Sequence, residues 1–205
     1  MGKCNLVIGA TLAGGLVLAA APAAHADPIT PYVITMTEQH GNVLAIGDGM
    51  IDLTGLLPGL VDSTPTNQAG VDPSGAQLEI GLSTNPFITY GATLSGPENF
   101  GTGATSLDSS SSGGAVASDI NGGSVILPEG YQSLTFISNS DLFDHATLAS
   151  LGVTPGVYTW TWGSGAEQSI TLDAEATPEP ASLLLLVSGL LAGLCLCRKR
   201  LFAGA

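Results

Sequence analysis

The chain has 205 residues and a formal net charge of −13, but it contains only four lysine and arginine residues. All four lie near the two ends, and the segment between Asp27 and Pro178 has none while holding sixteen of the seventeen acidic residues. This distribution excludes nucleic-acid binding, because the middle of the chain has no side chains that could neutralise phosphates.

Residues 1–26 have the features of a secretory signal peptide. Lys3 precedes an uncharged apolar run at 6–21, and Ala24 and Ala26 supply the small residues of a cleavage site. The sequence therefore predicts cleavage before Asp27 and export of the remaining chain by Sec-type machinery. The alternative is an uncleaved membrane anchor, which the short apolar run, rich in small residues, disfavours.

Residues 27–176 are expected to form one β-rich domain outside the cytoplasm. A chain of this length buries close to 70% of its extended surface on folding, which is enough for a core. Apolar and polar residues alternate in short runs, and the 28 glycines and 12 prolines of the chain are typical of strands joined by many turns. The predicted strands span residues 32–38, 43–46, 49–53, 77–82, 88–94, 124–127, 133–138, 156–162 and 169–173.

This spacing predicts an all-β fold, a single antiparallel sandwich or jelly roll. Residues 39–42 read as the turn of a hairpin, and a glycine at 47 or 49 is expected to form a bulge in its second strand. Residues 101–123, rich in glycine and serine, are expected to form a mobile loop. Residues 144–152 are expected to form the one short helix, with Asp144 at its N-cap and Gly152 at its end.

Three aromatic residues alternate with threonines in one predicted strand. Tyr158, Trp160 and Trp162 would lie on the same face of that strand. An exposed face of this kind could contact carbohydrate by stacking on sugar rings, whereas a buried one would supply the large side chains that a small core needs. Both interpretations are open from the sequence, and core packing is the favoured one.

The acidic residues of the predicted domain are dispersed over separate turns. Asp48, Asp52, Asp62 and Asp72 do not fit the spacing of a calcium-binding loop, so we expect no built metal site and no cofactor. The uncompensated negative charge nevertheless predicts weak, diffuse stabilisation by Ca²⁺.

No motif for catalysis accompanies the histidines that remain after cleavage, His40 and His145. His40 is expected in a turn and His145 in the first turn of the helix. No nucleophile elbow occurs, and basic residues that could hold a substrate are missing from the predicted domain. The sequence therefore predicts a protein that is not an enzyme, with no catalytic residues. A pair of carboxylates for glycoside hydrolysis would depend on the fold.

The C-terminal region has three parts in a fixed order. Pro178, Glu179 and Pro180 precede an uncharged apolar segment at 181–197, which is followed by a basic cluster. The basic cluster consists of Arg198, Lys199 and Arg200. At ~1.5 Å per residue the apolar segment is about 25 Å long, near the lower limit for a transmembrane helix, and the basic cluster predicts a cytoplasmic C-terminus.

This arrangement at 177–200 resembles the PEP-CTERM sorting signal of Gram-negative bacteria, with residues 201–205 as an additional tail. The resemblance implies processing by exosortase, a membrane protease, and delivery to the cell envelope, the outer surface or the extracellular matrix after an inner-membrane intermediate. Exopolysaccharide is the partner it implies there. The predicted function is that of an exported structural or interaction protein, and the alternative is a carbohydrate-binding module that uses the aromatic strand face.

Overall fold

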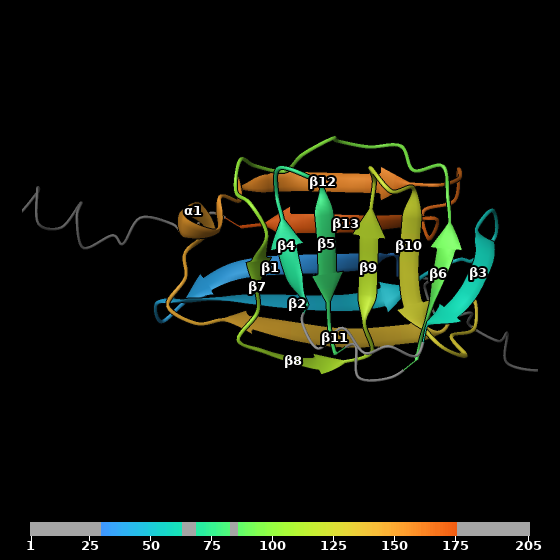
Figure 1. Ribbon diagram of the computed structural model, residues 1–205, viewed down its shortest axis with the longest axis horizontal. Helices are drawn as coiled ribbons and strands as arrows, with labels where there is room; N and C mark the ends of the chain where they lie inside the picture. Colours follow the sequence, from blue (N-terminus) through green and yellow to red (C-terminus); the bar gives the residue numbers. More distant parts are fainter. Residues whose placement is uncertain (1–29, 63–68, 83–85, 176–205) are drawn as a thin grey trace, which may run out of the picture.

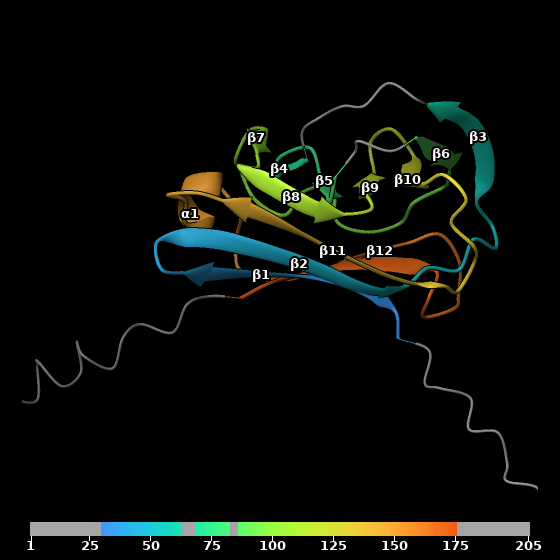
Figure 2. The same cartoon turned by 90° about the horizontal axis from the view of Figure 1, so that it is seen from below.

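Two β-sheets stack face to face in the computed structural model, which describes residues 30–62, 69–82 and 86–175 (Figures 1 and 2). The first sheet has the order β12 (Gly156–Thr161), β13 (Ser169–Ala174), β1 (Tyr32–Gln39), β2 (Asn42–Met50), β11 (Phe136–Phe143) and β8 (Ser110–Gly113). The second has the order β3 (Leu57–Asp62), β6 (Phe87–Gly91), β10 (Ser124–Pro128), β9 (Val116–Asp119), β5 (Gln77–Ile80), β4 (Gly70–Asp72) and β7 (Ser106–Leu107). The prediction of a β-rich, two-sheet architecture is confirmed.

The core lies between the two sheets and follows from the alternation of side chains along each strand. In β1, Tyr32, Ile34 and Met36 are buried, while the residues between them face solvent. The centre of the core is aromatic, because Phe100 packs edge-on against Trp160 with ring centroids 5.9 Å apart. Burial of these inward positions sets the register of the strands that carry them.

The first hairpin forms as the sequence predicts. β1 and β2 pair in antiparallel register and are joined by His40 and Gly41, whose φ angles are 53° and 82°. Two consecutive positive φ values give the hairpin turn that matches the twist of the strands. The bulge expected at Gly47 or Gly49 is wrong, since β2 pairs with β11 without a register shift up to Met50.

One strand pair departs from the expected antiparallel arrangement. β1 pairs with β13 in parallel, with Tyr32 opposite Ile170 and Met36 opposite Ala174, whereas the other pairs of labelled strands are antiparallel. These two strands lie at opposite ends of the domain sequence. No short turn joins them, so hairpin geometry does not impose an antiparallel direction.

The loop expected at 101–123 is wrong. This segment contains β7, β8 and β9, and Val116 in β9 is fully buried. The serine-rich β8 is an edge strand that pairs with β11 through its backbone, from Ser110 to Gly113. An edge strand with mostly exposed side chains does not need apolar residues, which is why its composition resembles that of a loop.

The helix is shorter than expected and starts later. α1 spans Leu148–Leu151, its N-cap is Thr147, and Gly152 ends it with a φ of 69°, so only the predicted end is confirmed. The Thr147 hydroxyl accepts a hydrogen bond from the Ser150 N–H (3.0 Å), and the Ser150 hydroxyl accepts one from the Thr147 N–H (2.8 Å). This capping box supersedes Asp144 as the cap. His145 therefore precedes the helix, with a φ of 54°.

The predicted signal peptide at 1–26, with Ala24, Ala26 and Asp27, lies outside the described residues. So do the sorting segment at 177–200 and the tail at 201–205. Within the described ranges, none of the helical structure has the length and apolar character to cross a membrane.

Candidate functional site

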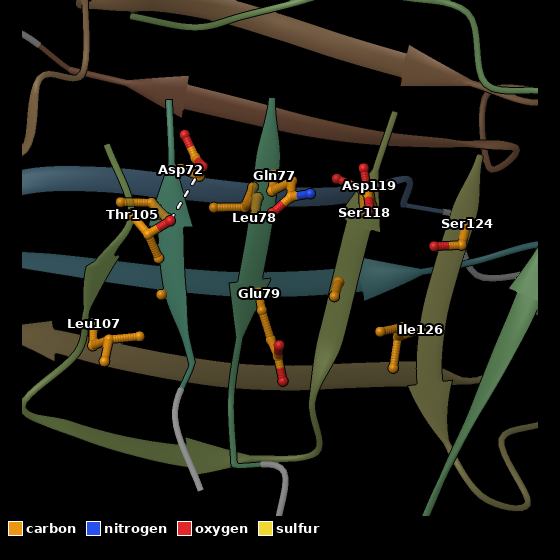
Figure 3. Close-up of a pocket in the computed structure, with 13 residues that line it drawn as sticks. Asp72, Gln77, Leu78, Glu79, Thr105, Leu107, Ser118, Asp119, Ser124 and Ile126 are labelled. Atoms are coloured by element: carbon orange, nitrogen blue, oxygen red, sulfur yellow. Dashed lines mark hydrogen bonds between the residues drawn. The ribbon is translucent and has the colours of Figure 1, made fainter. Parts of the chain in front are cut away.

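A shallow groove crosses the outer face of the second sheet (Figure 3). Its volume is about 220 Å³, and it runs over β7, β4, β5, β9 and β10. This is below the range of roughly 300–1,000 Å³ that is usual for small-molecule pockets. The groove is therefore an open surface on which part of an extended ligand could lie, rather than an enclosed pocket.

The groove exists because small residues stand between larger ones in one row across the strands. Strand register places five residues side by side on this face: Leu107, Gly70, Glu79, Ala117 and Ile126. The methyl group of Ala117 leaves a low floor beside Glu79, and the absence of a side chain at Gly70 allows the backbone of Ser106 and Leu107 to approach closely. The aliphatic side chains of Leu107 and Ile126 form two walls.

A second row, next to the first, is polar. Its members, Asp72, Gln77, Asp119 and Ser124, are also aligned by strand register. Figure 3 shows the side chains of this row along one side of the groove, with Thr105 beside Asp72. The groove is thus lined by two aliphatic walls and by hydrogen-bonding side chains of negative or neutral character.

Asp72 is held in place by its neighbours. Its Oδ1 accepts hydrogen bonds from the Ser74 hydroxyl (2.9 Å) and the Gly75 N–H (3.0 Å), and its Oδ2 accepts one from Thr105 (3.1 Å). The Gly75 bond is the largest contribution that lowers the pKa of Asp72 below its usual value. This carboxylate is therefore ionised at neutral pH and joins the β4–β5 turn to the segment that leads into β7.

Asp119 has a similar role in the next turn. Its Oδ1 accepts a hydrogen bond from the Gly122 N–H (2.8 Å), which closes the β9–β10 connection. The Asn121 side chain donates to the Gly75 carbonyl (2.7 Å) and so links this turn to the β4–β5 turn. The polar row of the groove is therefore held in place by two turns that are hydrogen-bonded to each other.

The groove can interact with hydroxyl groups or with a positively charged ligand. It presents the carboxyl groups of Asp72, Glu79 and Asp119, and the sequence from Asp27 to Pro178 has no lysine or arginine to offset them. Anionic ligands are therefore disfavoured. Among the described residues, no group of three or more His, Cys, Asp or Glu side chains is arranged as a metal site.

A second polar cluster lies inside the sandwich. The Tyr32 hydroxyl donates to Asn139 Oδ1 (2.6 Å), and Asn139 Nδ2 donates to the carbonyls of Ile80 (3.0 Å) and Gly114 (2.8 Å). Burial raises the pKa of the Tyr32 hydroxyl well above its usual value, so it stays a donor. The cluster satisfies backbone carbonyls at the ends of β5 and β8, where the chain leaves one sheet.

Asp141 belongs to the same interior region and is 1% exposed. Its Oδ1 accepts a hydrogen bond from the Gly81 N–H (2.9 Å), whereas its Oδ2 has no hydrogen-bond partner within the described part of the chain. Burial, with smaller contributions from the negative charges of Asp108 and Glu79, raises the pKa of this carboxyl to about 8. Asp141 is therefore mostly protonated at neutral pH.

The aromatic residues singled out in the sequence face the core. Trp160 is fully buried, and its indole N–H donates to the Pro97 carbonyl (2.9 Å). Tyr158 and Trp162 are partly buried and pack against the core, and Trp162 donates to the Asp52 carbonyl (3.1 Å). The three rings do share one face, but Trp160 has no free ring surface for a sugar, which favours the core-packing interpretation.

The two histidines lie at one end of the sandwich. His40 is in the β1–β2 turn, as expected, and the backbone N–H of His145 donates to Asn42 Oδ1 beside that turn (2.8 Å). Both side chains are exposed.

Sequence reasoning missed the groove because its lining comes from strands that it did not predict. β4, β7 and β9 were absent from the predicted elements, and these strands supply Gly70, Leu107 and Ala117. The segment at 116–119 has only four residues, too few for its sequence pattern to be distinguished from that of a loop.

Comparison with protein families identifies one region of the chain. A family model described as the PEP-CTERM protein-sorting motif matches residues 176–200. Neither a curated protein nor a solved structure matches the chain significantly. The motif implies an exported, exosortase-processed protein of the cell envelope.

Proposed function

We propose that this protein is a structural or interaction component of the extracellular matrix that associates with exopolysaccharide after its C-terminal segment has been removed. Export would use the signal peptide predicted at 1–26, and the segment at 181–197 would hold an inner-membrane intermediate for processing. The observation that carries the proposal is the sorting motif at 176–200.

The charge of the domain supports a role outside the cell and limits the partner. Sixteen acidic residues without a lysine or arginine keep the processed domain soluble and prevent adhesion to anionic surfaces. An acidic polysaccharide would be repelled unless divalent cations bridged it to the protein. The partner is therefore a neutral polysaccharide, or an acidic one linked through Ca²⁺.

The groove on the second sheet is the surface that suits such a partner. The walls formed by Leu107 and Ile126 can pack against the apolar faces of sugar rings, while Gln77, Glu79 and Ser124 can exchange hydrogen bonds with hydroxyl groups. The open shape suits a polymer that enters and leaves at both ends. Use of the aromatic strand has less support, because Trp160 is fully buried.

Intact mass of the protein from envelope and medium tests the sorting part of the proposal. The expected mature chain begins at Asp27 and lacks the basic cluster. Trypsin gives an independent readout, because the only sites after signal cleavage are Arg198, Lys199 and Arg200. Processed protein should keep its mass under trypsin, and a form that loses its last residues would show that the tail is retained.

Exopolysaccharide pull-down tests the matrix part. Glu79→Gln and Ala117→Leu should each weaken binding, the first by removing a charged acceptor and the second by filling the floor of the groove. Asp173→Asn is the matched control, since Asp173 lies on the outer face of the other sheet. Binding lost on addition of a chelator would indicate a Ca²⁺-linked polymer. Equal binding by all three variants would contradict the groove as the contact surface.

A further inference from the structure

The last strand of the sandwich is hydrogen-bonded to a neighbour on each side up to the point where the chain leaves the fold. β13 is an interior strand of the first sheet, between β12 and β1, and it is paired on both sides up to its last residue. Ala174 lies opposite Gly156 on one side and Met36 on the other. The N–H of Glu175 donates to the Met36 carbonyl (2.9 Å), so the chain is held in the fold to this point.

Very little sequence separates this point from the sorting motif. The motif match begins at 176, directly after Glu175, and five residues precede the apolar segment that starts at Ala181. Five residues reach at most about 18 Å even when fully extended. Pro178 follows Glu175 by only three residues, which limits its reach to about 11 Å.

The parallel pairing of β1 and β13 determines which end of the sandwich this is. Figure 1 shows the arrowheads of both strands beside α1, while the start of β1 lies at the opposite end. We call this surface the α1 end, formed by the β1–β2 turn at 40–41, residues 144–146, α1 and residues 152–155. Because β13 is the last strand and ends at this side of the sandwich, the motif that follows it starts next to the α1 end.

A membrane protease that cleaves near Pro178 must come within about 11 Å of Glu175, at the end of the sandwich where α1 lies. Freeing more chain would require β13 to separate from both neighbours and Ala174, which is 2% exposed, to leave the core. The hydrogen bonds of β13 to β12 and to β1 would both be lost before any new contact was gained. Close approach of the folded domain is the lower-cost arrangement.

The α1 end suits such an approach. Its exposed positions include Thr147, Ala149 and Ser150, whose short side chains leave the surface low. Asp144 and Glu175 are exposed at this end as well, so anionic lipid would repel it. The charge argues for a protein partner over the lipid surface.

We propose that the α1 end is the docking surface for the sorting protease, and that the folded domain contacts this enzyme while the motif is being cleaved. The proposal rests on the proposed processing by the sorting protease, and it adds the surface of the folded domain that the protease contacts. The opposite end, with the loop at 162–168, faces away from the membrane in the unprocessed protein.

The test compares the same bulky substitution at the two ends of the full-length protein in cells that contain the protease. Ala149→Trp places a large ring on the α1 end, and Ala166→Trp places it on an exposed position of the opposite loop. Pulse-chase analysis of tail removal should show processing slowed by about tenfold or more for Ala149→Trp. Ala166→Trp should be processed at the wild-type rate.

A short Gly-Ser insertion between Glu175 and Ala176 leaves the motif intact and lengthens the reach. It should restore processing of Ala149→Trp, which also shows that this variant is exported and folded. Wild-type rates for Ala149→Trp, or equal slowing with and without the insertion, would overturn the docking surface. Failure of the wild-type chain to lose its tail would instead refute the proposed processing.

Discussion

Replacing Asp141 with asparagine should stabilise the domain at neutral pH. The carboxyl is 1% exposed, accepts one hydrogen bond from Gly81 and has a pKa raised to about 8 by burial. In the unfolded chain its pKa returns to the usual value of 3.8. Between these values the folded state holds a proton that the unfolded state has released, so stability falls as pH rises.

The magnitude follows from the width of this interval. Each pH unit within it costs about 1.4 kcal/mol, so from pH 3.8 to pH 7 the penalty reaches about 4 kcal/mol and it levels off above pH 8. Asparagine keeps the acceptor oxygen for Gly81 and does not titrate. Asp141→Asn should therefore match the wild type near pH 4 and exceed it by up to about 4 kcal/mol at pH 7.

Urea unfolding of the processed protein at pH 4, 6 and 8, followed by the fluorescence of buried Trp160, measures this difference. Asp48→Asn is the control, because Asp48 is exposed on the outer face of β2 and its loss should have a small effect at every pH. A gain for Asp141→Asn that is the same at pH 4 and pH 8 would refute the reasoning, as would a wild type that becomes more stable over this range.

Three further changes test the packing. Tyr32→Phe leaves the buried Oδ1 of Asn139 without its donor and should cost about 1–3 kcal/mol, measured by urea unfolding at pH 6; an unchanged midpoint would mean that water replaces the hydroxyl. Trp160→Ala should cost about 3–5 kcal/mol and remove the blue-shifted part of the fluorescence, whereas a wild-type melting temperature would contradict full burial. Gly49→Ala should lower the melting temperature, because Gly49 has a φ of 130° and a Cβ would overlap the Pro31 carbonyl oxygen, while Gly130→Ala, with open space around it and a φ of 78°, should have the smaller effect.

Much of the first sheet could be predicted from the sequence. β1, β12 and β13 have apolar residues at alternate positions, β2 begins with the apolar run at 43–46, and the turn at His40 and Gly41 lies between β1 and that run. These signals are local, since a strand with one buried face shows its period in its own residues. The sorting segment could be identified for a similar reason, because its parts are contiguous.

The groove and part of the second sheet could not be predicted in this way, although the predicted strands at 77–82, 88–94 and 124–127 correspond to β5, β6 and β10. β4 and β7 have three and two residues, too few to show a period. In the first sheet, β8 was missed because its edge position requires no apolar side chains and its composition is rich in serine. The row from Leu107 to Ile126 exists only because two consecutive strand pairs, β4–β5 and β9–β10, are aligned with each other and with β7 through pairing between residues distant in sequence. Alignment of this kind depends on pairing between distant segments, and the local sequence pattern does not show which segments pair.

The sequence by itself determined that this chain has an acidic, exported middle segment without basic residues, with a sorting motif after it. Tertiary structure decided that Asp141 is buried, that the aromatic face of β12 points inward, and that β1 and β13 run parallel. That last pairing places the exit of the chain at the α1 end. The physical reason is that composition and contiguous motifs are properties of the chain, whereas burial and direction arise only when distant strands pack together.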